Sequence, residues 1–345
     1  MVNNDRYLKP QPMKNTVMAC LLLLCCSCAS LSKSQLDEVN QFGGATKTFA
    51  TYPAKVMSAL VDVHTQNQYF EVGIIVDANL HRQHVDSIYK WIQTSAKKDE
   101  EIALVFQIIS DYGQKLVHLT ANVHTLQLDT AAQSFGTNMD ALINKFNSLD
   151  PQHKVPTGYG AIIGQIIAVG GNMYVQDRQA KGAKAFVTKG DTLIGMMATK
   201  LEQYLSSEDI NSIKTSISRE RRELVHNYTA YLASDNELIN LYYKINKYGG
   251  KDSVTKKDTV ITGALKAWRS SGMGADSLYI KLLTNLDTDE TLRQQCLAAV
   301  ENLRKAHHKL MEDLQEKKNL KEVYEELQGY GASLRQLHST SSKIK

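Results

Sequence analysis

Apolar residues recur every three or four positions along most of this chain, which is the spacing of one face of an α-helix. The clearest stripe begins near Asp99 and contains Ile102, Val105, Ile109, Tyr112, Leu116, Leu119 and Val123. Strict alternation of apolar and polar residues, the pattern of a half-buried strand, is not sustained anywhere after residue 28. We therefore predict an all-α fold, namely an elongated bundle of long antiparallel helices.

Capping signals divide the middle of the chain into helices. A long helical stretch is expected up to Ser206, which together with Asp209 resembles a helix N-cap and its third position. Ser234 and Glu237 match a capping box, in which the serine accepts from a backbone N–H and the glutamate reaches back. We therefore expect a helix boundary at each serine, and a helix end at Lys247–Gly249 because glycine there suits a left-handed cap.

The distribution of proline favours long helices in the second half. The chain has five prolines, and none occurs in the 189 residues after Pro156. Proline inside a helix costs about 3 kcal/mol, whereas loops use it freely. Helical pieces are expected at Leu265–Trp268 and Leu278–Leu286, followed by a final long helix that begins near Asp287.

These patterns predict a division of the mature chain into four parts. Residues 28–46 are polar and contain serine and glycine, which is typical of a tether. The main helical bundle is expected at 47–248 and a loop at 249–262. Residues 263–345 are predicted to form a C-terminal helical region that packs on the bundle.

Residues 158–175 stand out because they combine glycine with a nearly continuous apolar surface. The residues that we single out there are Gly160, Ile163, Gly164, Ile167 and Gly171. Each glycine in a helix costs about 1 kcal/mol relative to alanine, so close packing of two backbones should offset the cost. One interpretation is a helix in the bundle core. The other is a membrane-inserting tip, because the layout loosely resembles that of helical pore-forming toxins.

A different pattern occupies the N-terminus. The apolar run Val17–Cys26 is ten residues long and follows Lys14, whereas a membrane-spanning helix needs about 20 apolar residues. Four of the five cysteines lie within nine residues that end at Cys28. Residues 13–30 resemble a bacterial lipoprotein signal peptide, in which small residues precede an invariant cysteine. Cys28 fits that cysteine best, because the small residue Ser27 precedes it.

This resemblance implies that the protein is located in the bacterial cell envelope. Residues 1–27 would be the signal peptide, with 1–12 as an N-terminal extension, and Cys28 would be acylated and so bind membrane lipid. Ala29 follows where an aspartate would favour the inner membrane, so the resemblance implies an outer-membrane lipoprotein that faces the periplasm or the cell surface. The alternative is an ordinary cleaved signal peptide that releases a soluble protein.

Charge and cysteine content narrow the classes of partner. Removal of residues 1–27 leaves 318 residues with a formal net charge of +2, which gives no electrostatic footprint for nucleic acid. Cys296 would then be the one thiol besides Cys28, so no intramolecular disulfide is expected and the fold depends on its core. Cys296 lies on an apolar stripe, which favours a place in the core over a role as nucleophile.

The histidine motifs give weak signals for metal binding. Glu223 and His226 have the Glu-x-x-His spacing of di-iron bundles, but such sites need a second copy and two more glutamates. His81 and His84 form a second i,i+3 pair, for which no third ligand is identifiable. The adjacent residues His307–His308 are interpreted as solvated. We expect no metal and no cofactor.

No nucleophile elbow, phosphate loop, dinucleotide fingerprint or zinc-protease motif occurs in the sequence. An enzyme is therefore not predicted. The sequence favours a lipid-anchored, non-catalytic scaffold or binding module with a protein partner in the envelope. The alternative is a membrane-active helical protein that inserts residues 158–175.

Overall fold

The fold is all-α, as predicted, in a computed structural model of the chain. The structure describes residues 31–73, 75, 77–98, 100–120, 138–152, 154–162, 175–209, 212–248, 254–316 and 320–343. Within these ranges the secondary structure consists of helices and short connections, without a strand.

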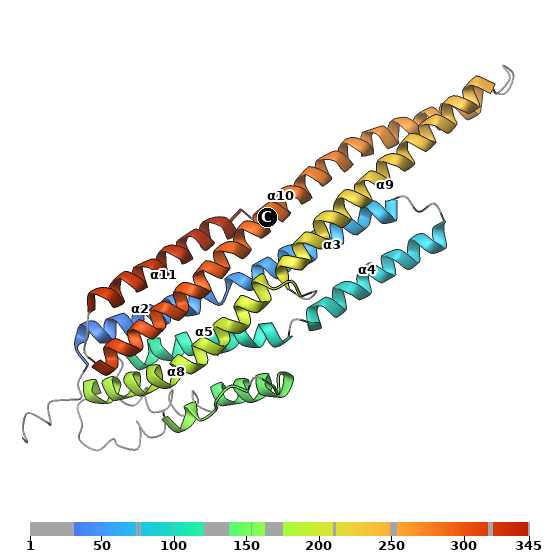
Figure 1. Ribbon diagram of the computed structural model, residues 1–345. Coiled ribbons are helices and arrows are strands. Elements are labelled where there is room, and N and C mark those ends of the chain that lie inside the picture. The colour runs from blue at the N-terminus through green and yellow to red at the C-terminus, as the bar shows by residue number, and fades with distance from the viewer. Residues whose placement is uncertain are drawn as a thin grey trace, which may run out of the picture.

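Figure 1 shows that most of the described helices run along one long direction. The described helices are α2 (Lys33–Phe49), α3 (Tyr52–Gly73), α4 (Ala78–Lys98), α5 (Glu100–Thr120), α8 (Val175–Ser206), α9 (Ile213–Tyr248), α10 (Val254–Glu316) and α11 (Leu320–Ser341). Residues 138–149 and 159–162 are also helical.

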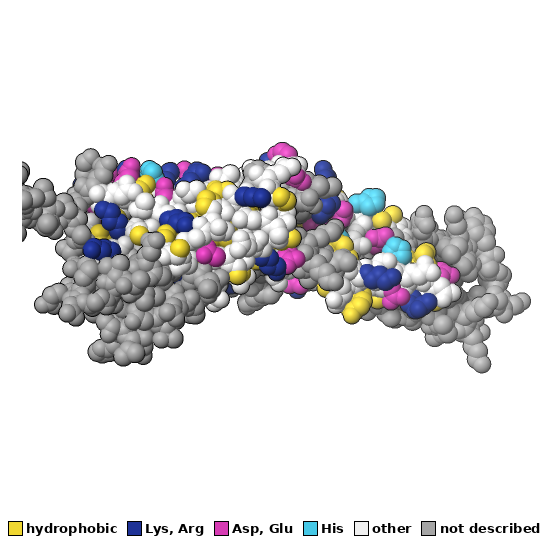
Figure 2. Space-filling model, turned by 90° about the horizontal axis from the view of Figure 1, so that it is seen from below, with side chains coloured by type: hydrophobic (Ala, Val, Ile, Leu, Met, Phe, Trp, Pro, Cys, Tyr) yellow, Lys and Arg dark blue, Asp and Glu magenta, His cyan; other side chains and the backbone are white. Residues whose placement is uncertain are grey.

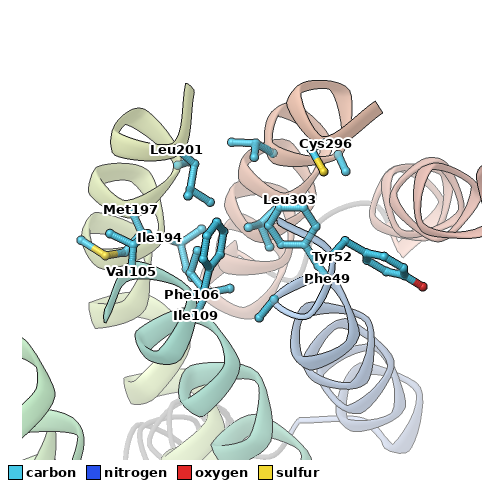
Figure 3. Close-up of a cluster of buried hydrophobic side chains, with 14 of the residues drawn as sticks. Phe49, Tyr52, Val105, Phe106, Ile109, Ile194, Met197, Leu201, Cys296 and Leu303 are labelled. Carbon is cyan, nitrogen blue, oxygen red and sulfur yellow. The ribbon is translucent and has the colours of Figure 1, made fainter. Parts of the chain in front are cut away.

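The core lies where α2, α3, α5, α8 and α10 meet. Figure 3 shows side chains from these helices converging, among them Phe49, Phe106, Met197 and Leu303. The apolar stripe predicted from Ile102 onward is the buried face of α5, because its described members lie in this core or pack against it. Periodicity therefore identified the inward face of α5 correctly.

Helix α10 is longer than the sequence indicated. We expected a loop at 249–262 and separate helical pieces before Asp287, but one unbroken helix runs from Val254 to Glu316, which is 63 residues. The physical reason is the absence of proline: glycine weakens a helix by about 1 kcal/mol, whereas proline removes a hydrogen bond and breaks it. The helix boundary predicted at Ser234 is also wrong, because Ser234 lies inside α9. Here too, no proline interrupts the helix.

The predicted tether at 28–46 is also wrong from Lys33 onward. Helix α2 begins at Lys33, where Ser32 forms a capping box with Gln35. Val39 and Phe42 on this helix are fully buried. Ser34, Asp37 and Gln41 lie on the exposed face of this helix, whereas Gln35, Glu38 and Thr46 are buried together with its apolar residues. Burial of one face therefore outweighs the polar composition that suggested a linker.

Two glycines bring α2 and α5 into backbone contact. A Cβ atom added at Gly43 would lie 2.7 Å from the carbonyl oxygen of Gly113, and one added at Gly113 would lie 2.6 Å from the carbonyl oxygen of Gly43. Contacts below 3.0 Å are not tolerated between a Cβ and a backbone atom, so neither position accepts a larger residue without separation of the helices. Gly44, the next residue, has open space around it.

The glycine-rich segment is only partly described. Gly160 belongs to the helical turn at 159–162, where its backbone N–H donates to Asp140 at 3.0 Å. The carboxylate of Asp140 also accepts from the N–H groups of Gly158 and Tyr159, so it caps this turn. Ile163, Gly164, Ile167 and Gly171, and the lipidation candidate Cys28, lie outside the described residues. None of the described helices is long and apolar enough to cross a membrane.

Some buried carboxyl groups lack partners. Asp289 on α10 is 1 % exposed, and neither of its oxygens has a hydrogen-bond partner among the described residues. Burial, with a smaller contribution from Asp62, raises the pKa of Asp289 from 3.8 to about 7. The native state therefore keeps a proton on this group that the unfolded chain loses near pH 4.

We predict that Gly113→Ala lowers the unfolding free energy by about 1–3 kcal/mol, because the new methyl group meets the α2 backbone. Gly43→Ala should do the same from the other side. The matched control is Gly44→Ala on the same helix, which should be neutral or stabilising by up to about 1 kcal/mol because alanine is the better helix former. Chemical denaturation measures all three, and equal effects at Gly43 and Gly44 would contradict the backbone contact.

We also predict that Asp289→Asn gains stability relative to the unmodified protein as the pH rises. Because the pKa of Asp289 is higher in the native state than in the unfolded chain, its contribution to the unfolding free energy is fully present below about pH 4. This contribution is lost as the pH rises to about 7, because the unfolded chain ionises at lower pH than the native state. The asparagine variant has no such loss. Melting temperatures at pH 4.5, 6 and 8 test this, with Asp287→Asn at an exposed position as control; a difference that does not change with pH would count against it.

Candidate functional site

A polar cleft of about 810 Å³ opens between α3, α8 and α9, with contributions from α4 and α5. Its floor is apolar and includes Leu60 and Ile213, which are buried. Its walls carry charged and hydroxyl side chains from different helices and from the connection between α8 and α9: His64, Glu101, Lys200, Ser207, Asp209, Arg219, Glu220 and Glu223. An apolar floor with a few convergent polar groups is the usual form of a binding site.

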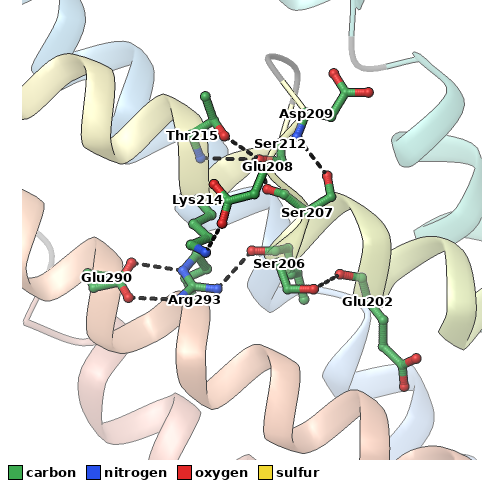
Figure 4. Close-up of polar contacts among 11 residues, drawn as sticks. Glu202, Ser206, Ser207, Glu208, Asp209, Ser212, Lys214, Thr215, Glu290 and Arg293 are labelled. Atoms are coloured by element: carbon green, nitrogen blue, oxygen red, sulfur yellow. Dashed lines mark hydrogen bonds and ion pairs between the residues drawn. The ribbon is translucent and has the colours of Figure 1, made fainter.

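The geometry of the cleft depends on the turn between α8 and α9. Arg293 of α10 is 8 % exposed at its side chain and donates to the carbonyl oxygen of Leu205 at 2.8 Å, so it caps the end of α8 (Figure 4). The same guanidinium holds Glu290 through two hydrogen bonds of 2.8 and 2.7 Å. The guanidinium of Arg293 and the carboxylate of Glu290 are both charged, and their two hydrogen bonds hold the side chains in a fixed geometry.

The N-cap of α9 lies six residues later than the sequence suggested. The expected cap was Ser206 with Asp209, but Ser212 is the residue whose hydroxyl accepts from the N–H of Thr215, at 3.1 Å (Figure 4). The Ser212 hydroxyl also donates to the carbonyl oxygen of Ser207 at 2.6 Å, which closes the turn. The Ser212 hydroxyl therefore fixes the start of α9, because it bonds both to the first turn of α9 and to the residue that follows α8.

The two walls of the cleft meet at a pair formed by His64 and Glu220. Nδ1 of His64 on α3 lies 2.9 and 3.0 Å from the two carboxylate oxygens of Glu220 on α9. Glu220 is 3 % exposed. The indole of Trp91 on α4 lies over the imidazole, with ring centroids 3.8 Å apart. Three helices thus hold one histidine ring in place.

Glu223 lies one turn after Glu220 on the same face of α9. Burial, followed by the negative charge of Glu220, raises the pKa of Glu223 above its usual value. One ligand atom from each of His64, Glu220 and Glu223 lies within 4.8 Å of the other two. Imidazole and carboxylate groups at this separation are capable of holding a metal ion.

The opposite wall carries a cation. Lys200 on α8 contacts the carboxylates of Asp150 and Glu101, and the distance to Glu101 is 3.4 Å. Burial alone would lower the pKa of Lys200, but these carboxylates outweigh it and raise that pKa. The α9 end of the cleft is therefore negatively charged, whereas at the α8 end the charge of Lys200 is balanced by Asp150 and Glu101.

Of the motifs predicted from the sequence, only Glu223 belongs to this group. Its expected partner His226 is exposed, and the structure supplies His64 in its place. His81 and His84 lie on α4, whose first turn is capped by Asp77 at 2.8 Å from the N–H of Leu80. Neither histidine belongs to a metal-capable group within the described part of the chain.

The interpretation of the pair His307–His308 as solvated is wrong for His307. The side chain of His308 is 52 % exposed, but that of His307 is fully buried. His307 lies between the hydroxyl of Tyr112, 2.6 Å from Nε2, and Asp191, 3.0 Å from Nδ1. Adjacent residues on a helix differ by about 100°, and here that angle separates core from solvent.

Cys296 is buried, as its place on an apolar stripe predicted. Burial raises the pKa of its thiol to about 12, so the nucleophilic thiolate is disfavoured.

On one face of the molecule, the described charged side chains are of both signs. On the face in Figure 2, basic and acidic side chains alternate over the parts that are described.

Comparison of the chain with protein family models, with curated proteins and with solved structures finds no match.

We predict that Arg293→Leu lowers the unfolding free energy by about 2–4 kcal/mol, because it removes the side-chain donor to the Leu205 carbonyl and leaves the Glu290 carboxylate with Gln294 alone. The control is Arg304→Leu, which removes another α10 arginine that pairs with α8. Arg304 pairs with Glu202 at 3.2 Å in a more exposed position, so its loss should cost less than about 1 kcal/mol. Urea denaturation compares them; similar costs would contradict the capping role of Arg293.

Proposed function

We propose that the protein is a lipid-anchored helical scaffold of the bacterial envelope, which reaches from the membrane toward a protein partner. In this proposal Cys28 holds the N-terminus in the outer membrane, and the bundle acts as a non-catalytic binding module. The partner is recognised away from the lipid surface.

The observation that carries this proposal is the length and direction of α10. At 1.5 Å per residue, its 63 residues extend about 95 Å. Its C-terminal end lies beside the start of α2, where Gln35 donates to Asp313 at 2.8 Å. Its N-terminal end lies beside the end of α9, at the far tip of the molecule in Figure 1. The start of α2 and this tip are therefore at opposite ends.

The early start of α2 adds to the argument. Lys33 is five residues after Cys28, and five extended residues span at most about 18 Å. An acylated Cys28 would hold the α2 end of the bundle close to the bilayer surface. The α9–α10 tip would then project away from that surface.

The root of the projecting pair is firmly packed. Tyr228 of α9 stacks on Tyr279 of α10, with ring centroids 4.0 Å apart, and Phe70 of α3 lies edge-on to Tyr228 at 5.7 Å. Beyond this cluster α9 and α10 continue as a pair, as Figure 1 shows. A pair of helices fixed at the base and extended at the tip is suited to presenting a binding surface at a distance.

Two experiments on the protein in its native membrane test the proposal. Mass spectrometry of the N-terminus should find Cys28 as the first residue with fatty acids attached. A photo-crosslinking amino acid at position 256, in the first turn of α10 near the tip, should capture a discrete protein partner. The same probe at the exposed position Lys321, near the other end of α10, is the control and should not capture it.

An N-terminus without fatty acid, or one that begins at another residue, would contradict the anchor. Equal capture from position 321 and from the tip would contradict presentation by α9 and α10. Leakage of dye from liposomes in the presence of the unacylated protein would favour the membrane-active alternative over the scaffold.

A further inference from the structure

We propose that His64, Glu220 and Glu223 form a binding site for a divalent transition-metal ion, with Zn²⁺ as the ion whose chemistry fits best. The site goes beyond the scaffold role and does not depend on it. It joins α3 to α9 on the wall of the polar cleft.

The first argument is the convergence of three ligand groups. One ligand atom from each residue lies within 4.8 Å of the others, and Nδ1 of His64 is 2.9 Å from Glu220. Ligands at about 2.0–2.1 Å from a tetrahedral zinc ion lie roughly 3.3 Å from one another. Small side-chain rotations would bring the three groups to this spacing without movement of either helix.

The second argument is the shortage of positive charge around the two carboxylates. Glu220 is 3 % exposed, and among the described residues its ion-pair partners are the ring nitrogen of His64 and Arg219, whose Nε is 4.0 Å away. Glu223 has no hydrogen bond or ion pair with any other described residue. Burial and the negative charges of Glu220 and Glu71 raise the pKa of Glu223, and the opposing effects of His64 and Arg219 do not cancel that rise. A divalent cation between Glu220 and Glu223 would remove the repulsion.

The third argument is the preorganisation of the histidine. Trp91 covers the imidazole ring at 3.8 Å between centroids, which restricts rotation of the ring. Glu220 and Glu223 are three residues apart and share one face of α9. Rigid helices that place all three groups in advance lower the entropic cost of binding an ion.

The donor set indicates the class of ion. One imidazole and two carboxylates form a mixed nitrogen and oxygen set, which suits Zn²⁺ and neighbouring transition metals better than Ca²⁺ or Mg²⁺, which prefer oxygen alone. Three protein ligands leave one tetrahedral position open. Because the site lines an open cleft, water or a ligand from solution has access to that position.

The competing interpretation is an ion pair between His64 and Glu220 that needs no metal. That interpretation accounts for the 2.9 Å contact but gives no role to Glu223, which lies at the same point and has no described partner. The two interpretations therefore differ in what Glu223 does. A substitution at Glu223 leaves the ion pair intact and removes a metal ligand.

The test uses untagged protein that has been treated with EDTA and dialysed. Titration with Zn²⁺ by calorimetry should show one ion per chain, and elemental analysis after gel filtration should recover it. Glu223→Gln and His64→Ala should each weaken binding by about tenfold or more, the minimum expected when a ligand is lost. Circular dichroism of the metal-free variants checks that they fold, and Glu223→Gln, at a half-buried position, is the safer variant.

The matched control is His308→Ala. His308 is an exposed histidine that also lies near two carboxylates, with Asp191 at 3.2 Å and Glu312 at 3.4 Å. This variant should bind Zn²⁺ as the unmodified protein does. Absence of stoichiometric Zn²⁺ binding, binding that survives in a folded Glu223→Gln variant, or loss of binding in His308→Ala would overturn the proposal.

Discussion

The contact between Gly43 and Gly113 is the constraint on which the packing of the bundle depends. It fixes α2 against α5 at backbone distance, since a Cβ on either residue would lie within 2.7 Å of a carbonyl oxygen. Tyr112, the neighbour of Gly113, then extends toward α10, where its hydroxyl meets His307. A third glycine provides the space, because a Cβ at Gly190 would lie 2.2 Å from that hydroxyl. Three glycines thus bring α2, α5, α8 and α10 together around one buried polar contact.

The cleft follows from this arrangement because α10 contacts both the core and the turn that starts α9. Helix α10 carries His307 in the core, and Arg293 about four turns earlier, which caps α8 at Leu205. The end of α8 determines where α9 begins, and α9 then runs beside α3 with Glu220 facing His64. The position of the histidine and the carboxylates is therefore a consequence of helix packing, with loops contributing little beyond the turn closed by Ser212.

The sequence predicted the fold class and the buried face of α5, because repeated apolar spacing is a local signal that burial in the core preserves. The sequence-based prediction was wrong where one residue type occurs in two kinds of structure, namely glycine in tethers and in packed helices, and serine in caps and in helix interiors. Gly43 was interpreted as part of a tether, and it is a packing residue inside α2; Ser234 was interpreted as a cap, and it lies inside α9. The candidate site could be predicted only in part. The i,i+3 spacing of Glu220 and Glu223 is visible in the sequence, but their histidine lies 156 residues away, and a single sequence carries no signal for that pairing.

The scaffold proposal and the metal-site proposal both concern the base of the α9–α10 pair. Helix α3 ends at Gly73, beside Tyr231 of α9, so α3 supports only the first half of α9 and α9 continues beyond it with α10. Phe70 and Tyr228 provide an apolar contact there, and His64 with Glu220 provides a polar one about two turns earlier. An apolar contact resists separation but permits sliding, whereas an ion bound by both helices fixes their register through directed bonds. Metal occupancy would therefore stiffen the base from which the pair projects, and the scaffold would reach its partner with a better-defined direction.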